Sequence, residues 1–127
     1  MTDCLDSWAV LRWLEGVEPA AGRVEASLTA RPVMSWINAG EVAYIVERMA
    51  GADQGRRVLL ALRRVLALEL PSEARVLEAA RIRAAHPMAY ADAFAVATAL
   101  AHRAVLLTGD PEILDAGGAW LTEDLRA

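Results

Sequence analysis

The sequence predicts an α/β protein with a mainly parallel sheet, and three observations support this prediction. Short apolar runs alternate with longer segments of helical periodicity, which is typical of strands joined by helices. The chain has 127 residues and is 56% hydrophobic, so it can bury one sizeable core and is too short for two ordinary domains. No repeat, low-complexity tract or linker interrupts it. We expect residues 1–127 to form a single domain.

The first half of the chain begins with a short apolar run before Asp6. Ser7 can cap the helix that follows, and Gly16 ends it. Apolar residues recur at helical spacing after Ser35, until Gly51 stops the helix. The elements expected here are strands at 2–5 and 32–35, and helices at about 8–14, 19–30 and 36–49.

The second half repeats this alternation of helices and strands. Asp53 and Ser72 can each cap a helix. Alanines alternate along residues 88–102, but alanine is poor in sheets and the segment is too long for an ordinary strand, so we expect a helix. The elements expected here are helices at about 53–66, 72–85 and 88–102, strands at 68–70 and 105–108, and a short helix after Pro111 followed by a strand near 120–122.

The charge balance disfavours several classes of function. A net charge of −4 argues against a broad, sequence-independent nucleic-acid clamp, although it does not exclude a local basic surface. All 13 basic residues are arginine, whose planar guanidinium can bind a phosphate through two hydrogen bonds. The absence of lysine disfavours enzymes that require one, including P-loop nucleotidases, receiver domains and haloacid-dehalogenase-like phosphatases.

Two groups of side chains have both a structural and a binding interpretation. The arginines of residues 53–83 either form a solvated helix face or bind an RNA backbone or an acidic partner. Trp8 and Trp13 can stack on bases, but we expect them to pack in the core.

Nothing in the sequence indicates export or membrane insertion. No uncharged run approaches the roughly 18 to 20 apolar residues of a membrane span, and residues 1–6 lack the basic and apolar regions of a signal peptide. Cys4 is the only cysteine, which excludes an internal disulfide and agrees with a reducing compartment. We therefore expect a cytoplasmic protein with no part in the membrane.

Four acidic residues are expected at one edge of the sheet. In a parallel doubly wound sheet, residues just after a strand, or early in the next helix, collect along the edge where ligands bind. These residues are Asp6, Glu41, Asp92 and Asp110. Together they would repel, so a divalent cation is the simplest counter-charge, and oxygen ligands favour Mg²⁺ or Mn²⁺ over zinc. Each acid also has an ordinary structural role open to it, as a helix cap, a turn residue or an exposed helix acid.

Four segments resemble, in order and spacing, the acidic motifs of PIN-domain ribonucleases. They are residues 5–11 (LDSWAVL), 38–41 (NAGE), 90–100 (YADAFAVATAL) and 106–112 (LLTGDPE). The resemblance spans nearly the whole chain and is strongest to the VapC toxins of bacterial toxin-antitoxin pairs. Two positions depart from the family pattern. Trp8 stands where a small hydroxyl or amide residue is common, and Gly109 stands where many relatives have a basic residue.

The resemblance implies a Rossmann-like three-layer α/β/α sandwich with four to five mainly parallel strands, usually forming a homodimer. It implies hydrolysis of RNA phosphodiester bonds with Mg²⁺, for which Mn²⁺ can substitute, by a catalytic centre of Asp6, Glu41, Asp92 and Asp110. Asp6 and Asp92 would be direct metal ligands and Asp110 a third or water-mediated one. Glu41 would position or deprotonate the attacking water, or hold a second ion.

The resemblance also implies a partner. This is a cognate VapB-like antitoxin, with a helical segment lying in a groove beside the acidic edge. The alternative to a ribonuclease toxin is a non-catalytic PIN-like module that binds RNA or a protein.

Overall fold

The computed structural model describes residues 1–126 and contains a five-stranded sheet. The strand order is β3-β2-β1-β4-β5, and every neighbouring pair is parallel. β1 is central, because the chain adds two strands on one side of it before adding two on the other. The predicted parallel, doubly wound sheet is therefore confirmed. The strands are β1 (Asp3–Leu5), β2 (Val33–Ser35), β3 (Ala67–Glu69), β4 (Val105–Thr108) and β5 (Thr122–Asp124).

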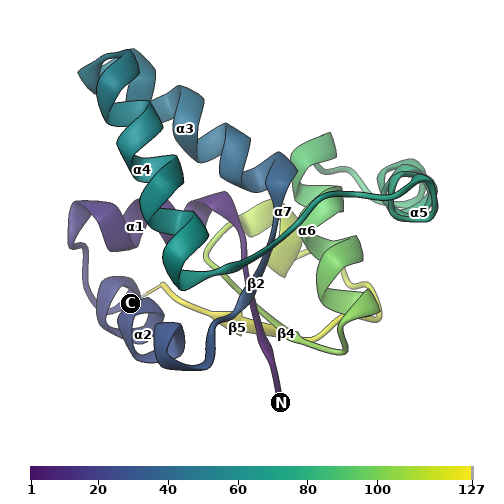
Figure 1. The fold of residues 1–127 in the computed structure, drawn as a ribbon. Coiled ribbons are helices and arrows are strands. Elements are labelled where there is room, and N and C mark those ends of the chain that lie inside the picture. The colour runs from purple at the N-terminus through teal and green to yellow at the C-terminus, as the bar shows by residue number, and fades with distance from the viewer. Residues whose placement is uncertain (127) are drawn as a thin grey trace.

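Helices cover both faces of this sheet (Figure 1). They are α1 (Ser7–Glu15), α2 (Ala20–Ser27), the 3-10 helix η1 (Leu28–Ala30), α3 (Trp36–Ala50), α4 (Ala52–Val65), α5 (Glu73–Ala85), α6 (Tyr90–Ala101) and α7 (Pro111–Leu114). Helices α1 to α4 pack on one face and α5 to α7 on the other, which confirms the three-layer arrangement. Among residues 1–126, no helix combines the length and the apolar character needed to cross a membrane.

Two hydrophobic clusters, one on each face, hold the layers together. Successive side chains of a strand point to opposite faces, so β1 contributes Cys4 to the cluster with α5 and α6, and Leu5 to the cluster with α1 to α4. Leu106 and Leu107 of β4 divide in the same way. Because both faces are covered, the inner strands have consecutive apolar residues, such as Cys4 and Leu5 in β1 and Val33 and Met34 in β2.

Two helices begin differently from the prediction. Asp6, not Ser7, caps α1, because its Oδ1 accepts a hydrogen bond from the Ala9 amide at 2.9 Å. Helix α4 starts directly after a glycine and has no side-chain cap. Asp53 lies within its first turn and forms an exposed ion pair with Arg56 at 3.0 Å.

The predicted bounds of two other segments differ from those in the structure. The helix expected over 19–30 is divided into α2 and η1. The last strand lies at 122–124 and not near 120–122, since its register is set by pairing Thr122 with Leu106 of β4. Trp120 instead packs edge-on against the ring of His86, with 5.0 Å between the ring centroids.

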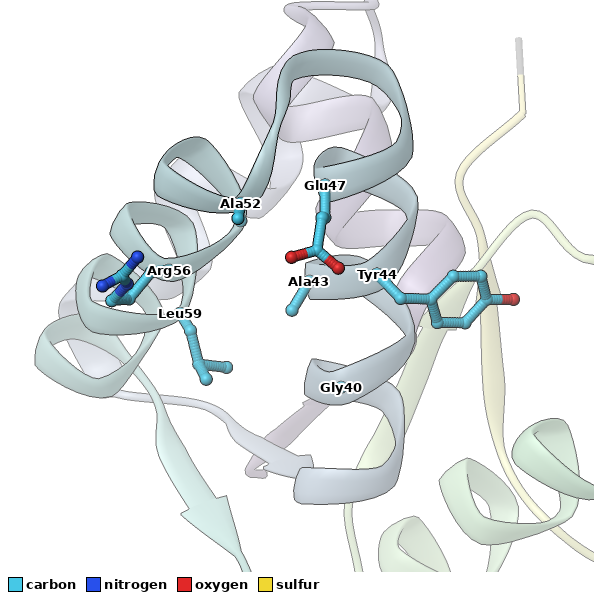
Figure 2. A pocket seen from close by; sticks show the side chains of 8 residues that line it. Gly40, Ala43, Tyr44, Glu47, Ala52, Arg56 and Leu59 are labelled. Carbon is cyan, nitrogen blue, oxygen red and sulfur yellow. The ribbon is translucent and has the colours of Figure 1, made fainter.

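Helices α3 and α4 form an arm that extends from the sheet (Figure 1). Gly55 allows the two helices to approach each other, because a Cβ there would lie 3.0 Å from the Ala43 carbonyl oxygen and 3.2 Å from the Glu47 Cβ. A hollow of about 380 Å³ remains between them, and Ala43 and Leu59 point into it (Figure 2). The arm therefore offers a groove on the helix that also carries Glu41.

Candidate active site

Asp6 lies at the carboxyl end of β1, and it is only 1% exposed. The Ala9 amide donates to its Oδ1, and the Thr108 hydroxyl donates to its Oδ2. Burial raises the pKa of Asp6 to about 7 in spite of these hydrogen bonds, and the charge of Asp110 acts in the same direction. Asp6 therefore caps α1 and also belongs to the acidic edge.

Asp92 lies in the first turn of α6 and is 7% exposed. Burial raises its pKa to about 8, and the charges of Asp110, Asp6 and Glu41 contribute in the same direction. Burial beside like charges therefore favours the protonated form of Asp92 when no cation is bound. The structure thus brings Asp92 together with the other three acids.

Asp110 and Glu41 complete the acidic edge from two other elements. Asp110 follows β4, and its Oδ1 accepts a hydrogen bond from the Glu112 amide at 2.9 Å, which caps α7. The Asp110 amide donates to the Thr108 hydroxyl oxygen at 3.0 Å. Glu41 lies in the second turn of α3 and accepts a hydrogen bond from the Ser7 hydroxyl. Thr108 therefore links Asp6 to Asp110, and Ser7, the neighbour of Asp6 in sequence, holds Glu41.

The acidic edge has no cation of its own. Within residues 1–126, none of the four acids forms an ion pair with an arginine or histidine. In the same residues, no three Asp, Glu, His or Cys side chains are already gathered around one point as metal ligands. The oxygen-only donors, and the raised pKa values of Asp6 and Asp92, fit a hard divalent cation that would replace the proton as counter-charge.

Asn38 is a buried residue of this edge that the sequence did not single out. Its Nδ2 donates to the Ala91 carbonyl at 2.9 Å, which ties α3 to the first turn of α6 beside Asp92. Its Oδ1 is buried and has no hydrogen-bond partner among the described residues. Such an oxygen is costly unless a water or ligand donates to it. One signal was available, since Asn38 precedes Glu41 by three residues and so shares its helix face.

Thr108 and Glu112 also organise the edge. Thr108 bridges Asp6 and Asp110, because its hydroxyl donates to the first and accepts from the amide of the second. The Glu112 Oε2 accepts a hydrogen bond from the Ala89 amide at 3.0 Å, at the residue that precedes α6. Both residues connect segments that are distant in sequence, so periodicity could not reveal these contacts.

The two positions that depart from the family pattern are in contact with each other. A Cβ on Gly109 would lie 2.3 Å from the Trp8 ring, so the indole occupies the space that a side chain at position 109 would need. The Arg12 guanidinium in turn lies 4.6 Å from the centroid of the Trp8 ring. The Trp8 ring therefore fits in its place because position 109 carries no side chain.

Three further residues have structural roles. Cys4 is buried, and burial raises the pKa of its thiol, which makes it a poor nucleophile. Trp13 packs partly against the core, as expected, and its indole donates to Glu25 at 2.6 Å. His102 lies at the end of α6 and contacts Glu69 at 2.7 Å.

Comparison with known proteins places this fold and its acidic edge in a family. The family model of the PIN domain matches residues 4–119. No curated protein matches the sequence. The solved structure of VapBC2 from Rickettsia felis, bound to a promoter DNA fragment, is similar at 16% identity with a TM-score of 0.78, covering 99% of this chain and 100% of that one. VapBC-1 from nontypeable Haemophilus influenzae is similar at 22% identity with a TM-score of 0.74, covering 98% of each chain.

A third similar structure is that of a toxin. VapC20 from Mycobacterium tuberculosis, described as a toxin that cleaves the sarcin-ricin loop, is similar at 15% identity with a TM-score of 0.73 and covers 91% of this chain and 95% of that one. These likenesses agree with the α/β/α fold described above. The family match is stronger evidence than these structural likenesses, because it spans most of the chain and includes all four acids of the edge. The chain therefore belongs to the PIN domain family.

Proposed function

We propose that this protein is a metal-dependent endoribonuclease that hydrolyses RNA phosphodiester bonds with Mg²⁺, for which Mn²⁺ can substitute. One observation carries the proposal. Asp6 and Asp92 are buried carboxyls with strongly raised pKa values, beside two further acids and without a cation. Buried like charges of this kind cost stability, and a divalent ion is the counter-charge that their oxygen atoms suit. Membership of the PIN domain family supports the same function.

Each residue of the acidic edge has a proposed role in this reaction. Asp6 and Asp92 would hold the ion directly, and Asp110 would be a third or water-mediated ligand. The bound ion would lower the pKa of a coordinated water and offset the negative charge that develops on the phosphate. Glu41, which is held by the Ser7 hydroxyl, would position or deprotonate the attacking water, or help to hold a second ion.

The same proposal includes a biological setting. The chain would be the toxic component of a toxin-antitoxin pair acting in the cytoplasm, with a VapB-like antitoxin as its partner. Two of the similar structures are described as VapBC proteins and one as a toxin. The hollow between α3 and α4 suits an apolar helical segment of the antitoxin, because Ala43 and Leu59 line it and Gly40 adjoins Glu41 (Figure 2). A helix bound there would lie beside the acidic edge.

We also infer a homodimer. Val76, Leu77 and Leu100 are exposed apolar residues on α5 and α6, and burying such residues between two copies would be favourable. Light scattering after gel filtration tests this assembly, since a dimer would have twice the chain mass of 13.7 kDa. A mass equal to that of one chain at all concentrations would refute it.

The enzymatic part is tested by incubating purified protein with single-stranded RNA in Mg²⁺, in Mn²⁺ and in EDTA. We expect cleavage with either ion, none in EDTA, and none by Asp92→Asn. Asp53→Asn is the matched control, because Asp53 also lies in the first turn of a helix but is exposed and pairs only with Arg56. Equal cleavage in EDTA, or by Asp92→Asn, would show that the proposal is wrong. RNA binding without cleavage in either metal would instead indicate the non-catalytic module.

A further inference from the structure

Trp8 and Arg12 form a unit beside the acidic edge without being part of it. Trp8 is two residues beyond Asp6, and its ring lies against Gly109, which precedes Asp110. Arg12 is one helical turn further along α1, with its guanidinium 4.6 Å from the Trp8 ring centroid. The ring is therefore placed between an arginine and the backbone that carries one of the four acids.

Arg12 is available to bind an anion. Its one carboxylate contact within residues 1–126 is Glu15 at 3.4 Å, and the two side chains are 36% and 51% exposed. Exposed pairs of this kind contribute little, so a ligand phosphate can displace Glu15 at small cost. A guanidinium binds phosphate through two parallel hydrogen bonds, and its stacking on an aromatic ring preserves the plane of those donors.

The surroundings of the unit suit a nucleotide. Trp8 and Arg12 line a hollow of about 220 Å³ together with the apolar residues Val17, Pro19 and Leu125. Glu18 and Arg126 also line this hollow; the Gly22 amide donates to Glu18 at 2.9 Å, and Arg126 is paired with Asp124 at 2.8 Å. The apolar side chains of this hollow can contact a base, and the adjacent guanidinium can donate hydrogen bonds to its phosphate.

We propose that Trp8 and Arg12 bind the RNA strand next to the phosphate that is cut. Arg12 contacts a neighbouring phosphate, and the Trp8 ring, which occupies the space of a side chain at position 109, holds the guanidinium in place. This inference rests on the proposed function, because RNA is the ligand in both. An acidic peptide would use the charge of Arg12 but has no base to place in the apolar hollow.

Binding is measured in EDTA, where no cleavage is expected, by fluorescence anisotropy of a labelled single-stranded oligoribonucleotide over a range of salt concentrations. We expect Arg12→Gln to weaken binding about fivefold or more and to lower the slope of log Kd against log salt by about 0.7, the value for one lost phosphate contact. Arg48→Gln is the matched control. The Arg48 guanidinium lies 5.7 Å from the ring of Tyr44, four residues earlier in α3, but at the end of the arm away from the sheet (Figure 1).

Several results would overturn the inference. These are absence of RNA binding by the wild type at low salt, equal effects of Arg12→Gln and Arg48→Gln, or equally tight binding of a glutamate oligopeptide with the same charge as the RNA. A failure of the proposed function can be distinguished from a failure of this inference. If Arg12→Gln weakens binding as expected while the wild type cuts nothing with Mg²⁺ or Mn²⁺, the RNA site stands and the enzymatic proposal does not.

A double-mutant cycle tests the link between Trp8 and position 109 without any use of RNA. Gly109→Ala should lower the melting temperature by about 3 to 8 °C in the wild type, because the new methyl group and the indole need the same space. In a Trp8→Ala background, the same change should have an effect of less than about 1 °C, since the space is then free. Equal losses in both backgrounds would show that Trp8 does not fill that space.

Discussion

Two groups of carboxylates in this protein have opposite surroundings. At the acidic edge, Asp6 and Asp92 are buried beside other acids, and burial raises their pKa values to about 7 and about 8. At the end of β3, Glu69 is also partly buried, but it accepts hydrogen bonds from Arg75 and contacts His102. These hydrogen bonds, above all those from Arg75, lower the pKa of Glu69.

The difference lies in where the positive charge comes from. Arg75 contacts Glu69 at 2.8 Å and Glu78 at 2.6 Å, so the chain supplies the counter-charge of this group itself. The acidic edge has no such partner within residues 1–126 and retains a proton instead. A buried carboxyl with a raised pKa costs on the order of several kcal/mol when it is forced to ionise. Among residues 1–126, only carboxyls of this edge have a raised pKa, which supports the proposal that a cation binds there.

The largest expected effect is that of Asp92→Asn. Losing a direct metal ligand should reduce RNA cleavage by at least about 100-fold, since even residues that only support a ligand can cost 10- to 100-fold. The metal-free protein should become more stable at pH 8, because a like-charge cluster loses one member. Cleavage assays and urea denaturation measure the two effects. A variant less stable than the metal-free wild type would show that Asp92 is a structural residue.

Metal binding should stabilise the wild type. At an Mg²⁺ concentration about 100 times its Kd, linkage predicts a gain of about 2.7 kcal/mol in the free energy of unfolding, and EDTA should reverse it. Thermal denaturation with and without the ion measures this gain. Glu69→Gln should keep the gain and Asp92→Asn should lose it, so a similar Mg²⁺ response in both variants would place the ion elsewhere.

The pH dependence of the metal-free protein should be opposite for the two groups. The pKa values of Asp6 and Asp92 rise from 3.8 in the unfolded chain to about 7 and about 8 on folding, so the native state binds more protons in this interval. Stability should therefore rise as the pH falls from about 8.5 to 5.5, because both groups take up protons in the native state over this range. Urea denaturation at the two pH values measures the change, and equal stability at both would contradict the prediction. The stabilisation from Glu69, whose pKa is lowered from 4.5, is lost only as the pH falls below 4.5.

The smallest effect concerns the ion-paired group. Glu69→Gln should reduce stability by about 1 to 2 kcal/mol, because Arg75 is largely buried and loses two charge-assisted hydrogen bonds. RNA cleavage should stay within about twofold of the wild type, since this group lies outside the acidic edge. A large loss of cleavage at unchanged stability would mean that the two groups are coupled.

Much of the fold and the outline of the site could be predicted from local features. Periodicity located the helices and strands, and the rule that strand ends share one edge brought together Asp6, Glu41, Asp92 and Asp110. One error arose where two local signals compete. Asp6 and Ser7 can each cap α1, and the choice depends on Glu41, which engages the Ser7 hydroxyl from 34 residues away.

The sequence by itself determined the order of the elements, the two buried faces of the sheet and the four acids at its edge, because these depend on residue spacing within each segment. Only the tertiary structure decided three contacts. Asn38 is bonded to the first turn of α6 beside Asp92, Trp8 fills the space at Gly109, and Glu69 is paired with an arginine. Those contacts join distant segments. They depend on strand register, on the distance between helices and on side-chain direction, which no local pattern of residues encodes.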